Sequence, residues 1–247
     1  MSDRILVVGC SYVANMRNAD GHNELDTDKV ILKFSSGAGN TWISARTIYE
    51  ATLSAYSKVV VLWSGVNRLD VSIPLGLHQL QRTLDDGTPA YTFHDIIGQS
   101  AWYHSGGFGL SGCSDPAPKF LQNFFKHQYL GVSNERNKDN RYLSEQTCLA
   151  IIHCQSFLEH RNIPYQMSFI YDCFTPQNII ENIEPGCGTL DRNNVFFNQV
   201  NWRKFNSDLR PYEYARMKKH LEVDNFHVTQ FGMISWFQDV LNIDLAG

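Results

Sequence analysis

The pattern of apolar positions along the chain predicts a sheet of parallel strands. The run from Ile5 to Val8 is closed by Gly9, and a branched aliphatic run of this kind is typical of a strand buried on both faces. Similar runs recur further along the chain. We expect strands at about residues 4–9, 30–35, 58–63 and 164–171.

Helical periodicity separates these strands. The pattern predicts helices from Thr41 to about Tyr56, from about Ser144 onward, and from about Thr229 to Leu241. Strands that alternate with helices favour a parallel sheet with right-handed crossovers and helices on both faces. The predicted fold class is therefore α/β, with a single domain over residues 1–247.

Two stretches interrupt this alternation, at about residues 70–142 and 174–222. Both are rich in aromatic residues, Asn, Gly and Pro, and neither has a clear period. We interpret them as irregular insertions into the same domain. The aromatic residues of the first insertion indicate an ordered segment over the edge of the sheet, where they form either a lid or sugar-stacking surface or part of the core.

Composition narrows the class of partner. The chain is 43% hydrophobic with a formal net charge of -4, which supports a buried core but gives no basic stripe for a nucleic acid backbone. The first strand begins near the amino terminus and no apolar run has the length of a membrane span, so we expect a cytoplasmic protein without a membrane partner. The six cysteines form no CxxC pair and are expected to be free thiols.

Four short blocks carry the candidate chemistry. They are GCSY at 9–12, SSGAGNTW at 35–42, LWSGVNRLD at 62–70 and DNFHVTQFG at 224–232. The first three follow predicted strands, and the fourth precedes the last predicted helix. Because the carboxyl ends of parallel strands meet at one edge of a sheet, we expect all four blocks to line one crevice.

The first and last blocks together contain the side chains of a nucleophilic triad. Asp224 and His227 are three residues apart, a spacing that lets the carboxylate hold Nδ1 of the imidazole and leaves Nε2 as a base. Ser11 sits in the predicted strand-to-helix turn and can lose its proton to that base as it attacks a carbonyl. The expected catalytic residues are therefore Ser11, Asp224 and His227.

The same blocks offer donors for the negative oxygen of a tetrahedral intermediate. These donors are the backbone N–H groups of Ser11 and Gly39 and the side-chain amide of Asn67. Glycine at position 39 lets the main chain come close to a substrate. We expect these three groups to form an oxyanion hole.

Taken in order, the four blocks resemble those of the SGNH (GDSL-type) hydrolase family. That family is named for the Ser of its first block, the Gly of its second, the Asn of its third and the His of its fourth. The resemblance covers the framework, at about 4–68 and 143–242 apart from 174–222, and leaves both insertions out. It implies a flavodoxin-like three-layer α/β/α sandwich and cleavage of acyl esters, including acetyl groups on sugars, without a metal. It assigns Ser11, Gly39, Asn67, Asp224 and His227 to the roles given above.

Three positions depart from the family pattern. Cys10 stands where the family often has Asp, Val228 follows the histidine in place of Pro, and Arg68 replaces an Asp of the third block. None of these changes removes a catalytic group. Arg68 alters the charge of the site and is a candidate contact for an anionic part of the substrate. We expect the side chain of Cys10 to point into packing.

The sequence does not support a dinucleotide-binding, α/β-hydrolase or metal-binding motif. The glycines of GFGLSG at 107–112 lack the strand before and the helix after that a dinucleotide fold requires, and no G-x-S-x-G elbow is present. The histidines show no HxxxH or HExxH spacing, so we expect neither a metal nor a cofactor. Further candidate substrate contacts are Trp102, Tyr103 and Asp172, although a loop cap is the simpler explanation of Asp172.

The sequence therefore predicts a serine esterase acting on small acyl esters, with O-acetyl groups on carbohydrate as the favoured substrate. Two alternatives stay open: a catalytically silent binding or structural module of the same fold, and a lipase or thioesterase. A lipase or thioesterase would need a long apolar groove and would favour longer acyl chains. The sequence does not indicate an oligomeric state.

Overall fold

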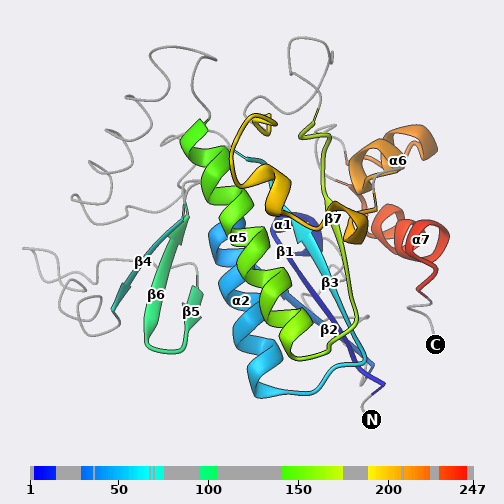
Figure 1. The fold of residues 1–247 in the computed structure, drawn as a ribbon. Helices are drawn as coiled ribbons and strands as arrows, with labels where there is room; N and C mark the ends of the chain where they lie inside the picture. Colours follow the sequence, from blue (N-terminus) through cyan, green and yellow to red (C-terminus); the bar gives the residue numbers. More distant parts are fainter. Residues whose placement is uncertain are drawn as a thin grey trace, which may run out of the picture.

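A computed structural model describes most of the framework of the chain (Figure 1). The residues it describes are 3–14, 29–35, 37–66, 68, 70–74, 95–104, 141–174, 189–206, 209–222 and 228–243.

The centre of the fold is a four-stranded parallel sheet. Strand β1 (Ile5–Gly9) lies between β2 (Val30–Phe34) and β3 (Lys58–Trp63), and β7 (Tyr165–Phe169) pairs with the outer side of β3. The order is β2-β1-β3-β7, with all neighbouring pairs parallel. Leu6 and Val7 have no exposed surface, which confirms that β1 is buried on both faces.

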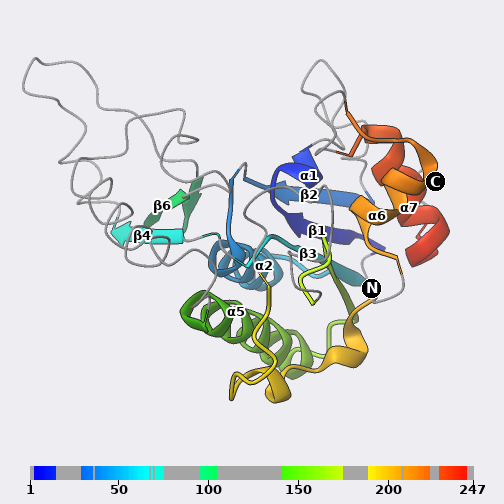
Figure 2. The same ribbon diagram turned by 90° about the horizontal axis from the view of Figure 1, so that it is seen from above.

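Helices flank this sheet. Helices α2 (Asn40–Leu53) and α5 (Arg141–His160) pack against each other over one face (Figure 1). The short α1 (Ser11–Ala14) follows β1, and α6 (Pro211–Lys218) and α7 (Gln230–Leu241) pack together away from the α2 and α5 pair (Figure 2). The predicted α/β class with a central parallel sheet is confirmed.

Helix α2 ends earlier than the predicted limit near Tyr56. Its last hydrogen bond runs from the N–H of Ser54 to the carbonyl of Glu50, at 3.1 Å. Three residues later the N–H of Ser57 donates to the carbonyl of Arg4, at 2.8 Å. The chain is already tied to the beginning of β1 at this point, so the helix cannot continue.

Regular structure also occurs where the sequence predicted irregular insertions. Strands β4 (Asp70–Pro74), β5 (Asp95–Ile97) and β6 (Ser100–His104) form an antiparallel sheet of order β4-β6-β5. The second stretch contains the 3-10 turns η3 (Phe197–Gln199) and η4 (Trp202–Lys204) and helix α6. These elements correct the expectation, which failed because strands and turns this short give too few residues for a period to emerge.

The described cysteines are thiols inside the core. Cys10, Cys148, Cys154 and Cys173 are free and buried, as predicted, whereas Cys113 and Cys187 lie outside the described residues. Cys10 has no exposed surface, which confirms that it points into packing. None of the helices within the described ranges has both the length and the apolar composition needed to cross a membrane.

Candidate functional site

Ser11 lies at the carboxyl end of the central strand β1. It is the first residue of α1 and is partly exposed, whereas Cys10 before it is buried. A Cβ atom on Gly9 would lie 2.6 Å from Cγ2 of Val13 and 3.1 Å from Cβ of Leu62. Glycine at position 9 therefore leaves room for Val13 of α1 and for Leu62 of β3 to pack against the end of β1.

Gly39 lies against the chain that follows β3. A Cβ atom at this position would be 2.8 Å from the carbonyl oxygen of Arg68 and 2.9 Å from Oδ2 of Asp70. On the same side, Nη1 of Arg68 donates to the carbonyl of Ala38 over 3.4 Å. The second and third sequence blocks therefore meet, and the close approach predicted for Gly39 is made to the protein's own backbone.

The carboxylate of Asp70 holds the amino-terminal end of α2. Its Oδ1 accepts the N–H of Gly39 and its Oδ2 accepts the N–H of Trp42, both over 2.7 Å. Nδ1 of His104 lies 2.8 Å from the same Oδ1. An ionised carboxylate only accepts hydrogen bonds, so Nδ1 carries the proton in this contact.

This acid and histidine are fully enclosed. Asp70 of β4 stands directly opposite His104 of β6, and their side chains are 0% and 1% exposed. The His104 ring also meets the ring of Trp42 edge to face, with the centroids 5.7 Å apart. The pair thus ties the antiparallel sheet to α2, and a role in holding structure follows directly from its contacts.

Asn40, the first residue of α2, connects this helix to the end of β3 and to α5. Its Oδ1 accepts the N–H of Ser64 over 2.8 Å, and its Nδ2 donates to the carbonyls of Ser64 and Gly65 and to Oγ1 of Thr147. Because Ser64 and Gly65 directly follow β3 and Thr147 belongs to α5, one buried amide joins the start of α2 to the end of β3 and to α5.

The remaining predicted site residues fall in different places. Asn67, Asp224 and His227 lie outside the described residues. Trp102 is 9% exposed and belongs to the core cluster, and Tyr103 lies in β6 opposite Val71 of β4. Thr229, beside the predicted base, caps α7 by accepting the N–H of Gly232 over 3.0 Å.

A tyrosine pair connects the loops after β1 and β7. The hydroxyl of Tyr12, the residue after Ser11, donates to the hydroxyl of Tyr171, the residue before Asp172. The two rings meet edge to face with centroids 5.2 Å apart, and Tyr212 packs on the other side of Tyr171 at 5.3 Å. The turn that carries Ser11 is therefore fixed to the turn that carries Asp172.

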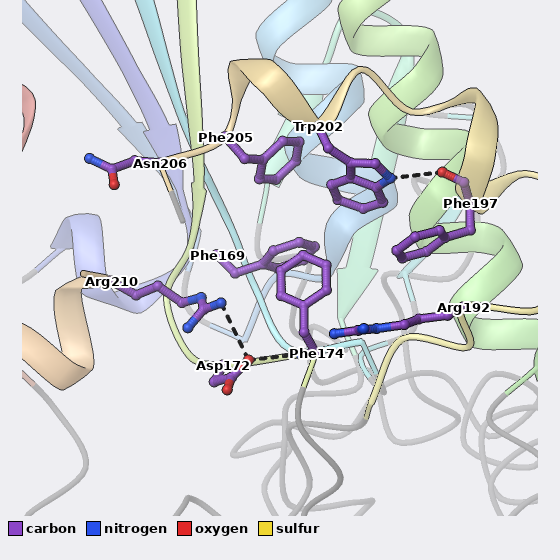
Figure 3. A pocket seen from close by; sticks show the side chains of 9 residues that line it. All are labelled: Phe169, Asp172, Phe174, Arg192, Phe197, Trp202, Phe205, Asn206 and Arg210. Atoms are coloured by element: carbon purple, nitrogen blue, oxygen red, sulfur yellow. Dashed lines mark hydrogen bonds and ion pairs between the residues drawn. The ribbon is translucent and has the colours of Figure 1, made fainter. Parts of the chain in front are cut away.

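Asp172 also lines a cavity of about 500 Å³ at the carboxyl end of β7 (Figure 3). The cavity is walled by five aromatic rings, two arginines, one aspartate and one asparagine. These are Phe169, Asp172, Phe174, Arg192, Phe197, Trp202, Phe205, Asn206 and Arg210. Its volume falls within the range of small-molecule pockets.

Charge in the cavity is organised around Asp172. Its Oδ1 accepts the N–H of Phe174 over 2.9 Å and lies 3.3 Å from Nη2 of Arg210. The N–H of Asp172 in turn donates to Oε1 of Glu213 over 3.0 Å. Burial raises the pKa of Glu213, and the nearby Arg210 opposes that rise in part. The loop-cap role considered for Asp172 is confirmed, and the same side chain also faces the cavity.

Sequence reasoning missed Asp70, His104 and most of the residues around this cavity. Asp70 closes the third block, and one signal pointed to it: Gly39 has no side chain with which to cap α2, so the cap must come from elsewhere. Apart from Phe169 of β7, the arginines and aromatic residues of the cavity lie in a stretch without periodicity. No local signal in the sequence unites them.

In comparisons with protein-family models, with curated proteins and with solved structures, no match to this chain was found.

Proposed function

We propose that the chain is a serine esterase of the SGNH type, with the flavodoxin-like three-layer α/β/α sandwich of that family. The observation that carries the proposal is Ser11, partly exposed in the first turn after β1 of a parallel sheet. Counted along the chain, the four parallel strands stand in the order second, first, third, fourth. Flavodoxin-like sheets begin in this order and bind ligands outside the carboxyl ends of the first and third strands.

In the proposed reaction, Oγ of Ser11 attacks the ester carbonyl while His227, oriented by Asp224, takes its proton. The tetrahedral intermediate collapses to an acyl-enzyme as His227 protonates the leaving alcohol. Water activated by the same histidine then releases the acid. The D-x-x-H spacing supports this pairing of Asp224 with His227.

The proposed oxyanion hole consists of the N–H groups of Ser11 and Gly39 and the amide of Asn67. The hydrogen bond from Gly39 to Asp70 bears on this proposal, because that N–H already has a strong acceptor at 2.7 Å. An oxyanion must share the N–H of Gly39 or displace Asp70 from it. The proposed substrates are small acyl esters, with O-acetyl groups on carbohydrate foremost and Arg68 as a contact for an anionic part.

The same hydrogen bond favours the second candidate, a catalytically silent binding module. If Asp70 keeps the N–H of Gly39 throughout, the oxyanion loses one donor, which typically costs about 10²–10³ in turnover. The esterase requires Ser11 for turnover and for covalent labelling, whereas the binding module shows neither.

The test is hydrolysis of p-nitrophenyl acetate by the wild type and by Ser11→Ala, together with labelling by a fluorophosphonate and intact mass. We expect the wild type to turn over and to gain one covalent adduct, and Ser11→Ala to lose about 10³-fold or more in turnover and to gain no adduct. Ser57→Ala is the matched control, because Ser57 is exposed and its hydroxyl donates to the carbonyl of Arg4.

Equal turnover of the wild type and Ser11→Ala would remove Ser11 from the mechanism. A folded wild type with neither turnover nor adduct would favour the binding module.

A further inference from the structure

We propose that the cavity at the end of β7 binds a flat aromatic carboxylate, with Arg192 holding the carboxylate and the ring wall around Phe174 and Trp202 holding the aromatic body. The inference rests on the cavity alone and does not require the proposed esterase activity.

The wall offers ring surface to a ligand (Figure 3). The Phe174 ring meets those of Phe169, Phe197 and Trp202 edge to face, with centroids 5.7, 6.4 and 5.3 Å apart. The indole N–H of Trp202 donates to the carbonyl of Phe197 over 2.9 Å, so this donor is used within the protein. A flat ring gains most from such a wall, because it can stack or meet the rings edge to face.

The cations at the wall exclude a positively charged ligand. Aromatic cages that bind ammonium groups present open ring faces, but here the guanidinium carbons of Arg192 and Arg210 lie 5.9 and 5.4 Å from the centre of the Phe174 ring. A ligand cation would meet two guanidinium groups at short range. The cavity therefore favours an anion.

Of the two arginines in the cavity, one is paired with a carboxylate of the described residues and the other is not, which indicates a ligand with a single negative charge. Arg210 is paired with Asp172, which is further held by Glu213 behind it. Within the described ranges Arg192 has a ring contact but no carboxylate partner. One guanidinium group matches one carboxylate in a two-point hydrogen bond, whereas a phosphate ester carries more charge than Arg192 alone offsets.

The volume of the cavity agrees with an aromatic carboxylate as the ligand. A cavity of about 500 Å³ lies within the range that encloses small organic ligands, and an acid with one or two fused rings fits that range. Arg192 itself is exposed, so it stands at the mouth of the cavity where a charged group can keep contact with water.

The test is isothermal titration of the full chain with four probes of one shape: 2-naphthoate, neutral 2-naphthamide, cationic 2-naphthylmethylammonium and 2-naphthyl phosphate. We expect 2-naphthoate to bind most tightly. Arg192→Gln should weaken its binding about tenfold or more and leave 2-naphthamide unchanged. Arg203→Gln is the matched control, because Arg203 is exposed on η4 next to Trp202 but does not line the cavity.

Phe174→Leu supplies a second measurement, since it shortens the ring wall without changing charge. It should weaken 2-naphthoate and 2-naphthamide by similar factors. The proposal is overturned if the amide, the ammonium or the phosphate binds as tightly as 2-naphthoate, if Arg192→Gln binds 2-naphthoate as the wild type does, or if no probe binds. Circular dichroism of each variant establishes that it is folded, and Ser11→Ala should bind 2-naphthoate normally whatever its activity.

Discussion

The backbone N–H of Gly39 donates to the carboxylate of Asp70 over 2.7 Å. The second oxygen of the same carboxylate accepts the N–H of Trp42 one turn further into α2, so an acid on β4 caps a helix whose own cap residue has no side chain. A negative charge at a helix amino terminus is also favoured by the helix dipole. Gly39, whose N–H is a proposed donor of the oxyanion hole, is thus part of the cap of α2.

We expect Asp70→Asn to lower the free energy of unfolding by about 2–3 kcal/mol. The asparagine has only one acceptor oxygen, so its amide group would face the N–H of Gly39 or Trp42, donor against donor. Urea denaturation measures the change. Asp3→Asn is the control, because Asp3 is exposed, and it should change stability by less than about 0.5 kcal/mol. An equally small change for Asp70→Asn would contradict the cap.

Gly39→Ala should destabilise the fold by about 1–3 kcal/mol, because its Cβ would lie 2.8 Å from the Arg68 carbonyl oxygen, a backbone atom that cannot move aside cheaply. Gly98→Ala provides the comparison: there the cost is the positive φ of 58°, and the nearest atom to the new Cβ is 3.7 Å away. That strain costs about 1 kcal/mol. Thermal unfolding of both variants ranks them. If Gly39→Ala were as stable as the wild type, the contact with Arg68 would be loose.

Stability should fall as the pH rises above about 9. Burial raises the pKa of the Cys154 thiol to about 12 from its usual value of 9.0. Between these values the unfolded chain has released a proton that the folded chain still holds, so each such thiol removes about 1.4 kcal/mol per pH unit from the free energy of unfolding. Below pH 9 the thiol is protonated in both the folded and the unfolded chain, so it removes no stability there. The thiols of Cys148 and Cys173 are shifted in the same direction by burial.

The measurement is guanidinium denaturation under reducing conditions at about pH 8 and about pH 10, comparing the wild type with Cys154→Ala. The variant should lose less stability over this interval, whatever its stability at the lower pH. Ser156→Ala, an exposed position on the same helix, should lose as much as the wild type. Identical pH slopes for all three proteins would show that Cys154 titrates alike in the folded and unfolded chains.

The sequence alone determined the strands of the central sheet and three of the helices, α2, α5 and α7. Runs such as Ile5 to Val8 and Val59 to Trp63 identify strands because a strand buried on both faces is apolar along its length. The start of α7 near Thr229 was equally legible, because the hydrogen bond that caps the helix there spans only three residues. These signals are local, and they also placed Ser11 in the turn after β1.

Tertiary structure alone decided the rest. Asp70 meets Gly39 and His104 across 31 and 34 residues of sequence, and the side chains of the β7 cavity are spread from Phe169 to Arg210. No period or motif marks such groups, because each position is selected by a partner far away in the chain. The sequence determined which segments become strands and helices, whereas packing between distant segments decided where α2 ends, what caps it and which charges face the cavity.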